Sequence, residues 1–203
     1  MTREGTNQKI ASYYERLIEQ HGHSPLSCDF GSTASQTRKF EIIAGATDFS
    51  NKTILDIGCG FGDFVTYLKQ EHTGFNYHGV DITPKMVEMA RSQHPDTRFE
   101  CRDVLQDPPD RIFDIVTSNG IFYLSGDNGW PFMKDMITQM FGLCTKVVAF
   151  NTLSTWADFM NEEEFYADPV ETLAFCHSLT PYVTMRHDYM THDFTVYLYR
   201  GQP

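Results

Sequence analysis

The chain has little positive charge: its 203 residues include 16 lysines and arginines against 27 aspartates and glutamates, for a formal net charge of -11. Long-range repulsion therefore opposes non-specific binding to a phosphate backbone or to anionic lipid. We expect neither nucleic acid nor a membrane surface as a partner.

The sequence also lacks paired cysteines and long apolar runs. No stretch approaches the roughly 18 apolar residues that span a bilayer, and the polar N-terminus shows no signal-peptide pattern. No C-x-x-C pair is present, and an odd number of scattered cysteines is typical of reduced thiols in a cytosol rather than of a disulfide framework or a zinc site. We therefore expect a cytoplasmic protein with buried, reduced cysteines: Cys28, Cys59, Cys101, Cys144 and Cys176.

No repeat, low-complexity tract or Pro/Gly-rich linker divides the chain, which predicts a single domain over residues 1–203. Apolar spacing predicts helices over about 10–21 and 35–44, ahead of the first strand. We expect residues 1–48 to form a helical lid and residues 49–203 to contain the core sheet.

The middle of the chain alternates between strand-like and helical patterns, which predicts a doubly wound parallel α/β sheet with helices on both faces. The last two strand-like runs are separated by too short a turn for a helical crossover, so they should form an antiparallel hairpin. One helix, expected from about residue 130 to 144, carries Met133, Met136 and Met140 on one stripe, as core residues do. The strands are predicted at 53–57, 77–80, 97–101, 112–118, 146–151, 182–187 and 194–199.

A glycine turn follows the first strand, and an acidic residue ends the second. Gly58, Gly60 and Gly62 bare the backbone where the next helix begins, so a ligand can lie against it. Asp81 stands where a carboxylate can accept both hydroxyls of a ribose. The competing interpretation is a tight turn followed by a solvated strand end. The spacing G-x-G-x-G, with Asp56 just before it, favours a cationic ligand over a pyrophosphate.

These features resemble the class I S-adenosylmethionine-dependent methyltransferases. The resemblance covers about residues 53–124, and the terminal hairpin agrees with the seven-stranded sheet of that family. It is carried by the runs Leu55-Asp56-Ile57-Gly58-Cys59-Gly60-Phe61-Gly62-Asp63, Gly79-Val80-Asp81-Ile82-Thr83-Pro84-Lys85-Met86, Arg102-Asp103-Val104 and Phe113-Asp114-Ile115-Val116.

The resemblance implies roles for particular residues toward S-adenosylmethionine. The glycine loop would pass under the amino acid part of the cofactor, with Asp56 beneath it near the methionine amine. Asp81 would hold the ribose, Ile82 would flank the adenine, and Asp103 would accept a hydrogen bond from its exocyclic amine. From spacing alone, Asp103 could equally cap a turn. The cofactor-binding residues expected are Asp56, Gly58, Cys59, Gly60, Gly62, Asp81, Ile82, Met86, Asp103, Val104, Asn119 and Arg38.

The acceptor side is less defined. His192 is the candidate general base if the reaction needs one, against an exposed turn histidine without a role. Arg38 would meet the methionine carboxylate if the helical lid closes, with Lys39 as a rival and a solvated arginine as the plainer interpretation. The residues expected at the substrate, where simple packing is the alternative, are Tyr14, Tyr123, Trp156 and Tyr189.

The preferred function is methylation of the oxygen or nitrogen of a metabolite or biosynthetic intermediate. Ser118-Asn119-Gly120-Ile121 stands where many base-modifying relatives carry an Asn/Asp-Pro-Pro-aromatic tetrad, which argues against nucleobase substrates. We expect no metal, since the sequence lacks an acidic or histidine-rich arrangement for one. The alternatives are a non-catalytic S-adenosylmethionine sensor or scaffold and, third, a nicotinamide oxidoreductase. The sequence leaves open the methylated atom and whether the chain forms a homodimer.

Overall fold

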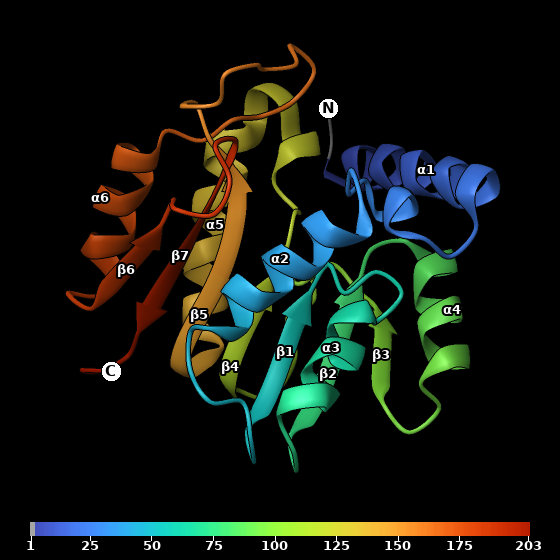
Figure 1. Ribbon diagram of the computed structural model, residues 1–203, viewed down its shortest axis with the longest axis horizontal. Coiled ribbons are helices and arrows are strands. Elements are labelled where there is room, and N and C mark those ends of the chain that lie inside the picture. The colour runs from blue at the N-terminus through green and yellow to red at the C-terminus, as the bar shows by residue number, and fades with distance from the viewer. Residues whose placement is uncertain (1–2) are drawn as a thin grey trace.

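The computed structural model describes residues 3–203, with Asp127 described by its backbone alone, and its centre is one seven-stranded sheet (Figure 1). Strands β1 to β5 all run parallel to one another. Strand β7 runs antiparallel to both of its neighbours, β5 and β6. The expected fold class is confirmed. The strands are β1 (Thr53–Ile57), β2 (Asn76–Asp81), β3 (Arg98–Cys101), β4 (Phe113–Ser118), β5 (Cys144–Leu153), β6 (Val183–Arg186) and β7 (Asp193–Tyr199).

The sheet order β3-β2-β1-β4-β5-β7-β6 places a reversal of winding between β1 and β4. In register, Ile57 at the end of β1 pairs with Val80 of β2 and with Ser118 of β4, so these three strands end at the same edge. In open α/β sheets, ligands bind at the carboxyl edge beside such a reversal. The fold therefore locates a candidate site there.

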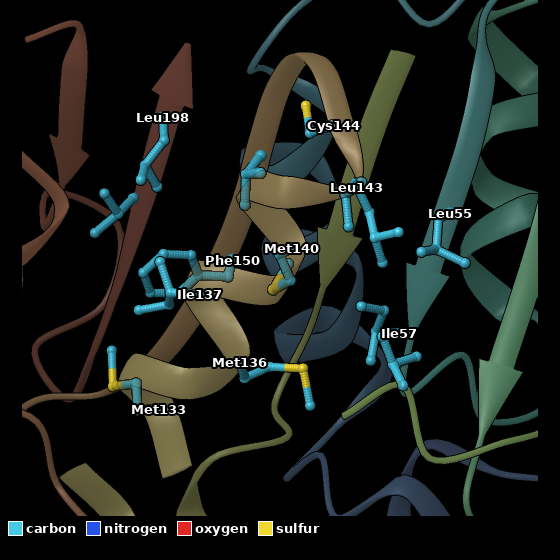
Figure 2. Packing of buried hydrophobic residues seen from close by; sticks show 14 of the residues in the cluster. Leu55, Ile57, Met133, Met136, Ile137, Met140, Leu143, Cys144, Phe150 and Leu198 are labelled. Carbon is cyan, nitrogen blue, oxygen red and sulfur yellow. The ribbon is translucent and has the colours of Figure 1, made fainter. Parts of the chain in front are cut away.

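Helices cover both faces of the sheet. One face packs against α5 and α6, and the other against α2, α3 and α4. Figure 2 shows Met133, Met136 and Met140 of α5 in the first of these cores, together with Phe150 and Leu198 from the sheet. All three methionines are buried, as predicted. The helices are α1 (Arg3–His21), α2 (Thr33–Ala44), α3 (Asp63–Glu71), α4 (Pro84–Gln93), α5 (Gly129–Gly142) and α6 (Pro169–Leu179), with 3-10 turns η1 (Pro25–Cys28) and η2 (Tyr123–Asn128).

Helix α6 is the element that the sequence pattern did not predict. Its exposed apolar residues, such as Val170 and Leu173, are not separated cleanly from its buried ones, so no helical stripe stands out. The local start signal is nevertheless present: the Asp168 side chain accepts hydrogen bonds from the N–H groups of Val170 and Glu171, and Pro169 opens the helix. The helix could have been found from its cap rather than from its periodicity.

Helix α1 begins at Arg3, about two turns before the apolar pattern that predicted it from residue 10. Its first turns are polar and reach the carboxyl edge of the sheet, where they contact the candidate site described below. No helix in residues 3–203 is long and apolar enough to cross a membrane.

The cysteine prediction needs correction. All five thiols are free, and Cys59, Cys144 and Cys176 are buried. Cys28, however, is half-buried and Cys101 is exposed. Cys101 ends the edge strand β3, where only one neighbouring strand can cover it.

Candidate functional site

The glycine loop after β1 presents bare backbone at the carboxyl edge of the sheet. Gly58 and Gly60 have φ of +77° and +53°, in the left-handed region that favours glycine. A Cβ added to Gly58 would lie 2.3 Å from Cγ2 of Ile121, and one added to Gly60 would lie 3.3 Å from Sγ of Cys28. The loop can therefore keep this path, and a ligand can approach it, only without side chains at these positions.

Asp81, at the end of β2, fixes this loop. Its Oδ2 accepts a hydrogen bond from the Gly60 N–H at 3.0 Å, and its Oδ1 accepts one from the Thr83 N–H at 2.8 Å. Burial raises the pKa of the Asp81 carboxyl above its usual value, although these hydrogen bonds oppose the shift. Each oxygen still has a lone pair, so the carboxylate can also receive donors from a ligand. Thr83 stands at the N-cap of α4, but its side chain makes no capping hydrogen bond.

Asp56 is the next-to-last residue of β1 and lies buried beneath the loop. The hydroxyls of Tyr77 and Thr117 donate to its two oxygens, the latter at 2.7 Å. Burial raises the pKa of the Asp56 carboxyl to about 6, against the lowering effect of these two hydrogen bonds. The group therefore changes charge close to neutral pH.

A cavity of about 530 Å³ opens over the loop, between α1 and the carboxyl edge. This volume lies in the range of small-molecule and cofactor sites. It brings together most of the predicted cofactor residues, and Tyr14 from the predicted substrate group. The predicted residues that line it are Tyr14, Asp56, Gly58, Cys59, Gly60, Asp81, Ile82, Met86, Asp103, Val104 and Asn119.

The residues present fit an adenosyl donor. Nδ2 of Asn119 is buried without a hydrogen-bond partner in the described structure, while its Oδ1 accepts from Asn151 at 2.6 Å. A buried donor without a partner is costly, so its presence at a cavity wall points to a ligand acceptor. The carboxylates of Asp56 and Asp81 suit positive charge and ribose hydroxyls. Apolar side chains of Ile82 and Met86 complete the wall.

Asp103 lies at the cavity, but the chain already holds it. Arg3 of α1 donates to both of its oxygens, at 2.6 and 2.9 Å, and Nδ2 of Asn7 donates at 2.7 Å. Burial by itself raises the pKa of the Asp103 carboxyl, but the hydrogen bonds from Arg3 and Asn7 bring it below its usual value. The backbone N–H of Leu105 also donates to it, so the predicted turn cap is real. An adenine amine would be a further donor to this carboxylate.

Sequence reasoning did not find Arg3 and Asn7, because the helix was predicted to start only at residue 10. Gln36 of α2, on the expected lid but not among the predicted site residues, lines the cavity and donates to Asp63 at 3.1 Å. Its neighbour Arg38 lines neither cavity described here and pairs instead with Glu41 at 2.7 Å on the exposed face of α2. Helical spacing alone did not show which polar residue of α2 faces the sheet edge.

Three other predicted residues line neither cavity. Gly62 caps α3 with φ of +82° and packs against Phe99. The hydroxyl of Tyr189 bonds to Asp193 and Thr195, where it supports the hairpin. Trp156 is 56% exposed, and its ring lies against His187.

A second cavity, of about 500 Å³, adjoins the first, and Cys28, Phe30 and Gly120 line both. It lies between η1, the end of β5, the loop over residues 155–166 and the tip of the β6–β7 hairpin. His192 and Tyr123 line it, and His192 is exposed. The Tyr14 and Tyr123 hydroxyls lie 2.8 Å apart, joining the two cavities. Within the described residues, no group of three or more His, Cys, Asp or Glu side chains is placed to hold a metal ion.

Comparisons with known proteins agree with this geometry. The model of a methyltransferase domain family matches residues 54–140. The protein Rv1506c of Mycobacterium tuberculosis, named as a methyltransferase, is 30% identical over 166 residues, which are 76% of this chain and 95% of the relative.

Among solved structures, magnesium protoporphyrin IX methyltransferase from Synechocystis PCC 6803, with bound S-adenosylmethionine, has a TM-score of 0.70 at 14% identity over 97% of each chain. The N-methyltransferase NodS from Bradyrhizobium japonicum WM9, with S-adenosylhomocysteine, has a TM-score of 0.66 at 15% identity, covering 97% of this chain and 99% of that one. At these identities, the structures show a shared fold. The sequence relative shows that this chain belongs to the methyltransferases, and the structures show that it has the fold of the class I, S-adenosylmethionine-dependent members.

Proposed function

We propose that this methyltransferase methylates a nitrogen or oxygen atom of a small molecule, a metabolite or a biosynthetic intermediate, in the cytoplasm. The observation that carries the proposal is the second cavity, which meets the cofactor cavity at Cys28, Phe30 and Gly120. Its volume of about 500 Å³ suits a small molecule. The net charge of -11 disfavours a nucleic acid acceptor, and the free cysteines are consistent with the cytoplasm.

Bound S-adenosylmethionine supplies a methyl group on a sulfonium, and the chain has to position the acceptor. The glycine loop and Asp81 hold the donor from one side of the junction. The second cavity holds the acceptor on the other side, so the two reactants meet where the cavities join. Alignment of the reacting atoms and exclusion of water can supply much of the rate without a covalent enzyme intermediate.

The test is turnover with purified protein, S-adenosylmethionine and a panel of amines, phenols and hydroxy acids, with S-adenosylhomocysteine measured by mass spectrometry. We expect acceptor-dependent formation of this by-product by the wild type, and none by an Asp81→Ala variant. Cofactor binding in calorimetry without turnover across the panel would contradict the proposal and favour the non-catalytic sensor.

A further inference from the structure

The charge of the second cavity distinguishes between classes of acceptor, an inference that rests on the proposed function. Four carboxylates and one lysine line the cavity. The charge of Lys39 is balanced within the protein, since its Nζ lies 2.6 Å from Asp193 in a buried ion pair. The other three carboxylates, Asp29, Asp158 and Glu164, have no ion-pair partner among the described residues. An anionic acceptor would be repelled here, and a cationic one attracted.

A buried hydroxyl gives a second and independent sign of a ligand in this cavity. Thr152, near the end of β5, lines the cavity and is 3% exposed. Its Oγ1 is buried without a hydrogen-bond partner in the described structure. Because an unsatisfied buried polar group is destabilising, a ligand group that forms a hydrogen bond with it would recover free energy.

A chain of hydroxyls connects the cofactor cavity to Asp29, which has no ion-pair partner among the described residues but also accepts a hydrogen bond from the Tyr13 hydroxyl at 2.7 Å. The Tyr123 hydroxyl donates to Oδ2 of Asp29 at 2.8 Å. A phenol has a single proton, so in the 2.8 Å bond between the two tyrosines Tyr14 must be the donor. The Tyr14 oxygen, on the wall of the cofactor cavity, then has only lone pairs to offer. It can receive an N–H or O–H group, whereas a carboxylate or phosphonate acceptor has no such donor.

The apolar part of the cavity indicates the rest of the acceptor. Phe30 lines both cavities, and Phe159, in the loop over residues 155–166, lines the second cavity while 81% exposed. An exposed aromatic side chain beside a pocket is free to cover an apolar group of the ligand. Both carboxylates and aromatic side chains thus line the pocket.

We propose that the methyl acceptor is a small amine with an apolar or aromatic part, bound in the second cavity with its nitrogen at the junction, where it reaches the Tyr14 oxygen on the wall of the cofactor cavity. The ammonium group gives one N–H proton to the Tyr14 oxygen as the Tyr14 proton moves to Tyr123 and the Tyr123 proton moves to Asp29, whose exposed carboxyl releases it to water. The nitrogen lone pair then forms the bond to the methyl carbon. The S–C bond breaks, and its electron pair stays on sulfur.

The first test measures binding rather than turnover. Amines and carboxylic acids matched in their apolar parts, phenethylamine with 3-phenylpropionate among them, are titrated by ligand-observed NMR against the full chain saturated with S-adenosylhomocysteine. We expect the amines to bind at least about 10-fold more tightly than the matched acids. Equal affinity, a preference for the acids, or no binding of any amine would overturn the proposal.

Variants then assign the preference to this cavity. Glu164→Gln and Asp158→Asn should each weaken amine binding roughly 3- to 10-fold and leave acid binding unchanged or stronger. Tyr14→Phe should weaken the amines while S-adenosylhomocysteine still binds. Glu162→Gln removes an exposed carboxylate of the same loop that does not line the cavity, and should change nothing. An equal loss of amine binding in Glu162→Gln would overturn the assignment, since long-range charge would then explain it.

Failure of this proposal can be told from failure of the proposed function. If the enzyme forms S-adenosylhomocysteine only with acids or neutral alcohols, it is a small-molecule methyltransferase whose acceptor is not an amine. If no acceptor class supports turnover, the proposed function itself fails.

Discussion

The two cavities have similar volumes but are built from different parts of the chain. The cofactor cavity has its floor on the ends of β1, β2 and β4 and on the glycine loop, where backbone geometry and two buried carboxylates define the site. The second cavity, which is the proposed acceptor cavity, is enclosed by η1, the end of β5, the loop over residues 155–166 and the hairpin tip. Under the proposed function, the ends of regular elements hold the cofactor, and mostly irregular segments hold the acceptor.

The largest effect should come from Asp81→Ala, which changes a residue of the cofactor cavity alone. Ribose hydroxyls would lose a charged acceptor, so we expect calorimetric affinity for S-adenosylhomocysteine to fall by at least about 100-fold. The N–H groups of Gly60 and Thr83 would also lose their partner, which should lower the melting temperature. Asp48→Ala, at a carboxylate outside both cavities, is the control. Retained affinity in Asp81→Ala would contradict the assignment.

Gly58→Ala should have the next largest effect and lower the affinity for S-adenosylhomocysteine roughly 10- to 100-fold. The new methyl group would meet Ile121 in a backbone conformation that costs an alanine about 1 to 2 kcal/mol, and the loop must shift to relieve both. Gly142→Ala is the matched control, because nothing lies within 4 Å of the added Cβ and its φ is not in the left-handed region. If calorimetry showed that the two variants bind S-adenosylhomocysteine equally well, the role of the glycine loop in cofactor binding would be refuted.

The pH dependence of the cofactor cavity should be set by Asp56. Its folded-state pKa of about 6 lies above the unfolded value, so its contribution to stability is greatest below about pH 4 and is lost as pH rises through 6. Cofactor binding should change the other way, since only the ionised carboxylate attracts the methionine ammonium. We expect the affinity for S-adenosylmethionine to rise about 10-fold between pH 5 and pH 7.

Tyr77→Phe makes this expectation sharper, because it removes a hydrogen bond that lowers the pKa of Asp56. The midpoint of the affinity profile should therefore move to higher pH. A midpoint that stays in place, or one that persists in Asp56→Asn, would assign the titration to another group.

The smallest effect is expected in the acceptor cavity. Thr152→Val removes a hydroxyl that has no partner, so the melting temperature should not fall, while KM for the acceptor should rise about 5-fold. Thr117→Val removes a hydroxyl that donates to Asp56 and should be destabilising. If the two variants have the same melting temperature, the distinction between the unpartnered Thr152 hydroxyl and the hydrogen-bonded Thr117 hydroxyl is wrong.

The same division explains what could be predicted from the sequence. The β1 bounds were predicted as observed, and Gly58, Gly60 and Asp81 line the cavity, because a short apolar run and glycines act locally, whereas Gly62 does not line it. The acceptor cavity depends on contacts between distant residues, such as Tyr14 with Tyr123, which are 109 positions apart, and Lys39 with Asp193, which are 154 apart. No local pattern encodes such pairs.

The most direct test of the account is a crystal structure of the full chain with S-adenosylhomocysteine. We predict the ribose at Asp81, the amino acid part over Gly58 and Gly60, and the thioether sulfur at Cys28 and Gly120, facing the second cavity. A ligand bound elsewhere, or a sulfur turned away from that junction, would contradict the claim that the two cavities form one methyl-transfer site.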